Sequence, residues 1–153
     1  MQNIRLATEA DVAILSQMRF ALRTKPENVE TEKAFLERCT EWMRNHLEND
    51  SWRCWIVEED DAIMGALWLQ LVEKIPNPTS ESEFFAYITN VFVKEWARGK
   101  GLGSKLLSEA FAFCEQQKVE TVILWPTEKS RPLYERHGFA VRSDVFELIL
   151  GNH

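Results

Sequence analysis

The stretch that decides the fold is Val91–Ser104, which reads V-F-V-K-E-W-A-R-G-K-G-L-G-S. Its first half is apolar and strand-like, and its second half places Gly99, Gly101 and Gly103 at every second position before a helix expected from about Leu102. Glycines permit a tight turn and leave backbone N–H groups unobstructed. The positive end of the helix dipole points at the same place. The stretch therefore predicts a turn that binds phosphate.

Spacing separates the known kinds of phosphate-binding turn. A Walker loop ends in Gly-Lys-Ser or Gly-Lys-Thr, and neither triplet occurs in the chain. The dinucleotide pattern Gly-x-Gly-x-x-Gly fails because Ser104 or Leu106 occupies its last position. Residues Arg98–Gly103 do fit Arg/Gln-x-x-Gly-x-Gly/Ala. On these residues alone, an ordinary glycine-rich turn between a strand and a helix is an equally good interpretation.

Two further blocks flank this turn in the sequence. Phe84–Val93 (F-F-A-Y-I-T-N-V-F-V) precedes it, and Ser130–Phe139 (S-R-P-L-Y-E-R-H-G-F) follows it. With the blocks in this order, the chain resembles the GNAT superfamily of acetyl-CoA-dependent N-acetyltransferases. The resemblance covers nearly the whole chain and implies one domain over residues 1–153. It also implies an α/β GNAT fold, with a mixed central sheet of about six to seven strands, a splayed βαβ core and about four helices.

Hydrophobic periodicity and turn signals predict the individual elements. The expected helices run from about Val12 to Leu22, with Pro26 ending that helix, and cover Thr31–Glu48, Leu102–Gln117 and the short segment around Tyr134. The expected strands are Asn3–Ala7, Trp52–Glu58, Ile63–Val72, Phe84–Val93, Thr121–Trp125, Phe139–Val141 and Val145–Leu150, the last of which closes the sheet. Thr8 and Asp11 predict a capping box, Ser130 an N-cap and Gly138 a left-handed C-terminal cap. The second helix is expected to bury Phe35, Cys39, Trp42, Met43 and His46.

The resemblance also implies where the co-substrate acetyl-CoA binds. Its pantetheine arm would pair with the backbone of the strand that ends at Val93, and a backbone N–H of Asn90–Phe92 would stabilise the oxyanion. Tyr134 would donate a proton to the departing thiolate, although a merely packed tyrosine is the alternative. No metal is expected. The cofactor-binding residues are expected to be Val91, Phe92, Val93, Arg98, Gly99, Lys100, Gly101, Leu102, Gly103 and Ser104.

A general base is harder to assign. Many relatives carry a glutamate on the splayed strand, whereas Phe84–Val93 contains no carboxylate. Two routes stay open for the proton of the amine. Water relays it to Glu83, Glu128 or a histidine, or the amine arrives already neutral at some cost in rate near pH 7.

The sequence marks the acceptor pocket less clearly than the acetyl-CoA site. Tyr87 and Thr89 share strand parity and should face one side, as a substrate surface or as an ordinary half-buried face. Of the 6 tryptophans, Trp125 is the best candidate for substrate contact, because it ends a strand at the edge where ligands of open α/β sheets gather.

Composition limits the partners. A formal net charge of −6 disfavours nucleic acid as a partner, and the N-terminus lacks an apolar run for export or membrane spanning. Cys39, Cys54 and Cys114 are scattered and read as reduced thiols in a cytoplasmic protein. The expected partners are a small-molecule or peptide amine and, through the resemblance, a second copy in a homodimer. A noncatalytic acyl-CoA-binding or regulatory module is the alternative to an enzyme.

Overall fold

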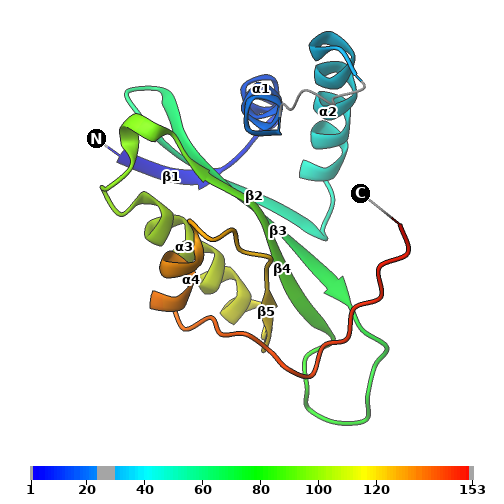
Figure 1. The fold of residues 1–153 in the computed structure, drawn as a ribbon. Helices are drawn as coiled ribbons and strands as arrows, with labels where there is room; N and C mark the ends of the chain where they lie inside the picture. Colours follow the sequence, from blue (N-terminus) through cyan, green and yellow to red (C-terminus); the bar gives the residue numbers. More distant parts are fainter. Residues whose placement is uncertain (1, 24–29, 152–153) are drawn as a thin grey trace.

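The computed structural model describes residues 2–23 and 30–151, coloured along the chain in Figure 1. Pro26, the expected end of the first helix, lies outside the described residues. The elements follow one another in the order β1 (Gln2–Leu6), η1 (Glu9–Asp11), α1 (Val12–Arg23), α2 (Glu32–Leu47), β2 (Trp52–Glu59), β3 (Ala62–Glu73), β4 (Phe84–Val93), η2 (Glu95–Ala97), α3 (Leu102–Gln116), β5 (Val122–Ile123) and α4 (Arg131–Arg136), where η marks a short 3₁₀ helix.

The described strands form one sheet in the order β1-β2-β3-β4-β5. Neighbouring strands are antiparallel except β4 and β5, which are parallel and are joined by the crossover helix α3. Figure 1 shows α1 and α2 on one face of the sheet and α3 and α4 on the other. The arrangement confirms the expected mixed α/β fold with a βαβ core.

Each face of the sheet carries its own hydrophobic cluster. Leu69 and Ile88 pack with α3, whose Leu106 and Leu107 are fully buried. Ile56 packs on the other face with Val12 of α1 and other buried residues of α1 and α2. Strand side chains alternate between the two clusters, as a sheet covered on both faces requires.

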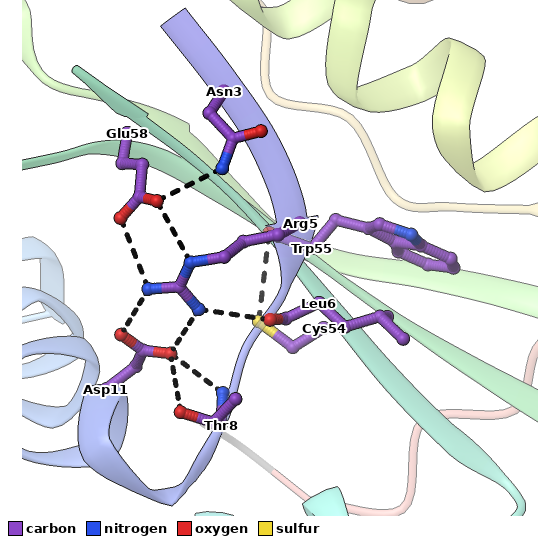
Figure 2. Close-up of polar contacts among 8 residues, drawn as sticks. All are labelled: Asn3, Arg5, Leu6, Thr8, Asp11, Cys54, Trp55 and Glu58. Carbon is purple, nitrogen blue, oxygen red and sulfur yellow. Dashed lines mark hydrogen bonds and ion pairs between the residues drawn. The ribbon is translucent and has the colours of Figure 1, made fainter.

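A network of ion pairs fastens β1 to its neighbours, as Figure 2 shows. The Arg5 guanidinium donates to the Asp11 carboxylate at 2.9 and 3.0 Å and to the Glu58 carboxylate at 3.1 and 3.2 Å. The Thr8 N–H also donates to Asp11, at 2.7 Å, within the expected capping box. The hydrogen bond from Arg5 lowers the pKa of Asp11, which keeps its carboxylate charged.

Helix α2 differs from expectation. Of its predicted buried stripe only Met43 is buried, while Phe35, Cys39 and His46 are half-buried and Trp42 is 39% exposed. The helix packs mainly against α1 and meets the sheet with only part of one face. Its outer aromatic side chains therefore pack on one another: the Trp42 ring stacks on His46, with centroids 3.9 Å apart.

The last part of the chain contains fewer strand residues than the sequence predicted. Residues 139–141 and 145–150 form no strand, and β5 has 2 residues where the sequence predicted Thr121–Trp125. A strand exists only where a neighbour accepts its backbone hydrogen bonds, and no described strand lies beside residues 139–150. Ser130 occupies the predicted N-cap position of α4 although its side chain makes no cap bond, and Gly138 adopts the expected left-handed conformation at φ 93°.

Candidate functional site

Strands β4 and β5 pair over a short stretch and then diverge. Their pairing is limited to Ala86 with Val122 and Tyr87 with Ile123, although β4 continues to Val93. Residues 88–93 of β4 therefore have no described strand on the side of β5. We call this segment the open edge of β4. Its free N–H and C=O groups can pair with an extended ligand that carries amide groups.

A β-bulge shapes the open edge. Ala66 pairs with Phe92 and Trp68 with Thr89, so Leu67 alone faces both Asn90 and Val91. Asn90 has a φ of 54°, in the left-handed region that asparagine tolerates better than most residues. Such a bulge bends its strand and re-aims the neighbouring groups. The parity of alternating residues did not predict it.

The side chain of Asn90 connects this bulge to α1. Its Oδ1 accepts a hydrogen bond of 3.0 Å from Nη1 of Arg19. The Arg19 side chain is half-buried, and desolvation by burial lowers its pKa, with a smaller contribution from the nearby charge of Arg23. No carboxylate in residues 2–23 and 30–151 forms an ion pair with Arg19. No sequence pattern marks Arg19, because a single arginine on an amphipathic helix fits no motif.

The glycine turn lies at the end of β4 and starts α3. Gly99 and Gly101 have positive φ angles of 81° and 74°, and Gly101 is the N-cap of α3. The first helical hydrogen bond is donated by Lys105 to Gly101, so the N–H groups of Leu102, Gly103 and Ser104 stay free for a ligand. No atom lies within 4 Å of a Cβ built on Gly101. The turn thus presents open N–H groups at a helix N-terminus, as an anion site requires.

Gly103 has a different role from the other two glycines. Its backbone is helical, and a Cβ there would approach Cδ2 of Leu133 on α4 to 3.1 Å. A second contact lies beside it, because Nε2 of His137 is 2.9 Å from Oγ of Ser104. Gly103 therefore permits close packing of α4 against the start of α3, and the His137 contact, which the sequence did not predict, ties the same two segments together.

Both basic residues of the turn are exposed. Arg98 donates from Nε to the carbonyl of Val93 at 3.1 Å and so ties the turn to the end of β4. Lys100 makes no hydrogen bond or ion pair with a described residue. Both charges precede the free N–H groups of α3 in sequence and leave guanidinium and ammonium hydrogens available to phosphate.

Tyr134 is buried on α4, where 7% of its surface is exposed. Its ring packs edge-on against Phe139 with centroids 5.7 Å apart, and its hydroxyl forms no hydrogen bond with a described residue. Desolvation raises the pKa of the phenol, so Tyr134 stays protonated at neutral pH. A protonated hydroxyl that has no partner among the described residues is suited to donate a proton to a bound ligand.

The predicted acceptor residues lie on the α1 and α2 face of the sheet. The ring of Tyr87 meets the ring of Trp125 edge-on at 5.3 Å, and 72% of Trp125 is exposed. Thr89 lies opposite Trp68, whose side chain belongs to the cluster under α1 and α2. The structure therefore brings Tyr87 and Trp125 together and places Thr89 on the same side as Tyr87.

The candidates for a general base are two exposed glutamates and a histidine next to a backbone carbonyl. Glu83 is exposed, the Glu128 side chain is 95% exposed, and Nδ1 of His46 lies 2.7 Å from the carbonyl of Trp42. Strand β4 thus offers hydroxyl and amide groups, and no carboxylate, to an incoming amine.

The described residues give little evidence of metal binding or of reactive thiols. No group of three His, Cys, Asp or Glu side chains could hold a metal ion there. Burial raises the pKa of Cys54 and raises that of Cys114 to about 11, so these thiols stay protonated. None of the helices described is both long and apolar enough to cross a membrane.

Comparisons with known proteins agree with this geometry. Residues 15–139 match the model of the acetyltransferase (GNAT) family. A Bacillus subtilis protein described as "Putative phosphinothricin acetyltransferase YwnH" is 26% identical over 141 residues, covering 90% of this chain and 83% of that protein. A GCN5-related N-acetyltransferase from Ralstonia eutropha JMP134 is 25% identical with a TM-score of 0.80, covering 99% of this chain and 100% of that one.

A Clostridium acetobutylicum protein described as a predicted acetyltransferase, whose crystal structure contains acetyl-CoA, has a TM-score of 0.83 at 23% identity, covering 98% of this chain and 97% of that one. Because the family model matches most of the chain, the protein belongs to the GNAT family of acetyltransferases. It is an acetyl-CoA-dependent acetyltransferase, and the resemblance inferred from the sequence blocks is confirmed.

Proposed function

We propose that residues 1–153 act as one domain that transfers an acetyl group from acetyl-CoA to a primary amine at the open edge of β4. The observation that carries this assignment is that this edge leads directly to the free N–H groups of α3. The backbone of Val91–Val93 would pair with the pantetheine amides, and the turn from Arg98 to Ser104 would bind the pyrophosphate. The Clostridium protein, which has the same fold and whose crystal structure contains acetyl-CoA, supports the choice of co-substrate.

The transfer needs no covalent enzyme intermediate. The amine nitrogen attacks the thioester carbonyl carbon, and a backbone N–H near Asn90 stabilises the oxyanion of the tetrahedral intermediate. The C–S bond then breaks and the phenol of Tyr134 protonates the sulfur, giving an amide and free CoA. The proton lost from the amine passes to water, since β4 carries no carboxylate to accept it, and a proton from water restores the phenol of Tyr134.

For the acceptor, we propose a small molecule or peptide that binds beside Tyr87, Thr89 and Trp125. The half-buried guanidinium of Arg19, whose one hydrogen-bond partner among the described residues is the neutral amide of Asn90, supports an acceptor with an anionic group near its amine. A carboxylate there would supply the charge that Arg19 lacks among the described residues. A polyamine would instead add like charge next to Arg19.

The test is a panel of matched amines with detection of free CoA thiol. Each α-amino acid is paired with the amine that lacks its carboxylate. We expect faster thiol release from the carboxylate member, and loss of that preference in Arg19→Gln. Equal rates within every pair would refute the role of Arg19. Acetyl-CoA binding without thiol release from any amine would favour a noncatalytic acyl-CoA-binding module.

The cellular location, the partners and the assembly of the protein are also proposals. All 3 cysteines are free, which supports a reducing, cytoplasmic environment. The net charge of −6 supports a protein that binds neither nucleic acid nor anionic membrane surfaces. We propose a homodimer as its assembly.

A further inference from the structure

The start of α3 and the end of α4 meet through a pair of polar side chains. Nε2 of His137 lies 2.9 Å from Oγ of Ser104, and both residues are half-buried. Figure 1 shows α4 alongside α3 on the same face of the sheet. The contact lies at the helix N-terminus whose free N–H groups are proposed to bind the pyrophosphate. The effect of the imidazole on Ser104 therefore bears on how acetyl-CoA is bound.

The hydroxyl of Ser104 lies on the ligand side of that helix end. In an α-helix each Cα–Cβ bond tilts toward the N-terminus, so the side chain of Ser104 covers the turn that precedes it. That turn carries the free N–H groups of Leu102 and Gly103. Apart from His137, no described residue forms a hydrogen bond with Oγ of Ser104. The hydroxyl can therefore join these N–H groups in binding one anion.

The ring of His137 is held in place by its own helix and by α3. The backbone N–H of His137 donates to the carbonyl of Tyr134 at 3.0 Å, which closes the last turn of α4. The ring is tilted against Phe111 of α3, with centroids 6.0 Å apart. Nδ1 forms no hydrogen bond with a described residue, so within that part of the chain only Ser104 bonds to the imidazole. The contact with Ser104 therefore decides which ring nitrogen carries the proton.

The hydrogens available at this contact determine its direction when a phosphate is bound. A serine hydroxyl has one hydrogen and two lone pairs, whereas an ionised phosphate oxygen only accepts hydrogen bonds. A phosphate at this helix end therefore takes the one hydrogen of Ser104. Nε2 of His137 can then keep its 2.9 Å contact only by donating to a lone pair of Oγ. Without a hydrogen on Nε2, the imidazole would compete with the phosphate for the hydroxyl hydrogen.

We propose that His137 is a positioning residue for acetyl-CoA: its Nε2–H donates to Oγ of Ser104 and directs the hydroxyl hydrogen of Ser104 toward a phosphate oxygen. The inference rests on the proposed binding of the pyrophosphate at the start of α3, and it adds a residue of α4 to that site. Both the neutral ring with its proton on Nε2 and the imidazolium can act in this way. Because His137 touches no reacting atom, its effect is on affinity.

The first test locates the ring proton by long-range ¹H–¹⁵N NMR on the full chain saturated with CoA, which carries the same phosphates as acetyl-CoA. The chain has 3 histidines, and the spectrum of His137→Gln assigns the signals of His137 by their loss. We expect Nε2 of His137 to be protonated in the complex. In Ser104→Ala the ring should lose this preference and show a mixture of tautomers. A bare Nε2 in the wild-type complex would overturn the proposal.

The second test is a double-mutant cycle on the Kd of CoA, measured by calorimetry. His137→Leu should raise Kd about threefold to tenfold, the range for one neutral hydrogen bond. His137→Gln is the matched control, because its amide N–H can replace Nε2–H, and its Kd should stay within about twofold of the wild type. Since His137 acts through Ser104, Ser104→Ala/His137→Leu should bind CoA as Ser104→Ala does.

The cycle also separates positioning from mere packing of α4 against α3. A packing role predicts that His137→Leu weakens CoA binding equally in the wild type and in Ser104→Ala, and such additive effects would refute the proposal. Gly101→Asp shows independently whether the turn binds the phosphates. If Gly101→Asp abolishes CoA binding while His137→Leu leaves Kd unchanged, the role of His137 is wrong and the proposed function stands. If Gly101→Asp binds CoA normally, the phosphate placement and the inference that rests on it both fail.

Discussion

The open edge of β4 and the face of β4 toward α1 and α2 belong to one strand and are built by different means. Along the edge, the groups available to a ligand are backbone N–H and C=O, continued by those at the start of α3. On the face, the groups are side chains from separate elements: Arg19 from α1, Tyr87 from β4 and Trp125 after β5.

This difference explains why the sequence marks the open edge of β4 more clearly than the face of β4 toward α1 and α2. A site made of backbone needs particular conformations, and glycine or asparagine marks them in the sequence. A site made of side chains needs only that distant residues meet, and no local pattern records such a meeting. The proposed co-substrate site was therefore readable as a motif, whereas the proposed acceptor site was not. The following variants test whether this division holds.

The largest effect is expected from Gly101→Asp at the backbone site. Acetyl-CoA should raise the Tm of the wild type, and this rise should nearly vanish in the variant, because a carboxylate would face the pyrophosphate. Gly101→Asn is the matched control, since asparagine tolerates the left-handed φ of 74° without adding charge. It should keep much of the shift. An unchanged shift in a folded Gly101→Asp variant would show that this turn does not bind the phosphates.

Next in size is Tyr134→Phe. It should keep the fold and acetyl-CoA affinity while kcat falls by about 10²-fold, the low end for general acid catalysis, because a CoA thiolate is already a fair leaving group. Burial raises the pKa of Tyr134, so the wild-type rate should fall only above the ordinary phenol pKa of about 10. That alkaline fall should flatten in the variant. A wild-type kcat with the same pH profile would leave Tyr134 a packing residue.

A smaller effect is expected for the two charges of the turn. Arg98→Ala and Lys100→Ala should each weaken acetyl-CoA binding by about 1–3 kcal/mol, or roughly 5–150-fold in Kd, as measured by calorimetry. Arg98→Ala should have the larger effect, because it also removes the bond to the Val93 carbonyl. Lys33→Ala on α2 makes the same change in net charge at an exposed position and should leave Kd unaltered. Wild-type Kd values for both turn variants would contradict phosphate binding by these side chains.

The smallest effect on function is expected from Asp11→Asn, which alters the network around Arg5. Because the pKa of Asp11 is lowered in the folded state, its stabilisation is present above the unfolded pKa of about 3.9 and is lost as the pH falls through the folded value. Urea unfolding should show the variant less stable by about 1–2 kcal/mol at pH 7, with the difference shrinking below pH 4.

Acetyl-CoA affinity in Asp11→Asn should match the wild type. The ion-pair network joins β1 and β2, and β3 separates these strands from the open edge of β4. Glu58→Gln is the control: its side chain is more exposed than that of Asp11, so the variant should lose less stability. A pH-independent difference between Asp11→Asn and the wild type would show that packing, rather than charge, accounts for it.

Several predicted elements were right because their causes are local. The apolar strand before the glycine turn, the amphipathic α3 and the two strands on either side of Asp60 and Asp61 all matched the structure. The two aspartates adopt φ angles of 51° and 64°, which short polar side chains tolerate in tight hairpins. In each case the sequence pattern and the final contacts require the same conformation.

Predictions failed where a neighbour decides the outcome. The stripe on α2 has helical spacing, but how deeply it is buried depends on how far the helix lies over the sheet, and Trp42 ends up exposed. The bulge at Asn90 depends on the register between β3 and β4, and the contact with Arg19 depends on that bulge. Residues 145–150 have a strand's alternation, yet no described strand lies beside them.

The sequence by itself therefore determined the class of fold, the membership of an acetyltransferase family and the glycine turn proposed to bind acetyl-CoA. The α/β class and the turn follow from short-range rules of glycine conformation, helix amphipathicity and strand alternation, whereas the family membership rests on the resemblance of three sequence blocks to known acetyltransferases. Only the tertiary structure decided the opening between β4 and β5, the placement of Arg19 at the bulge and the exposure of residues 145–150. Each of these depends on which segments become neighbours, and that choice is made by the packing of the whole chain.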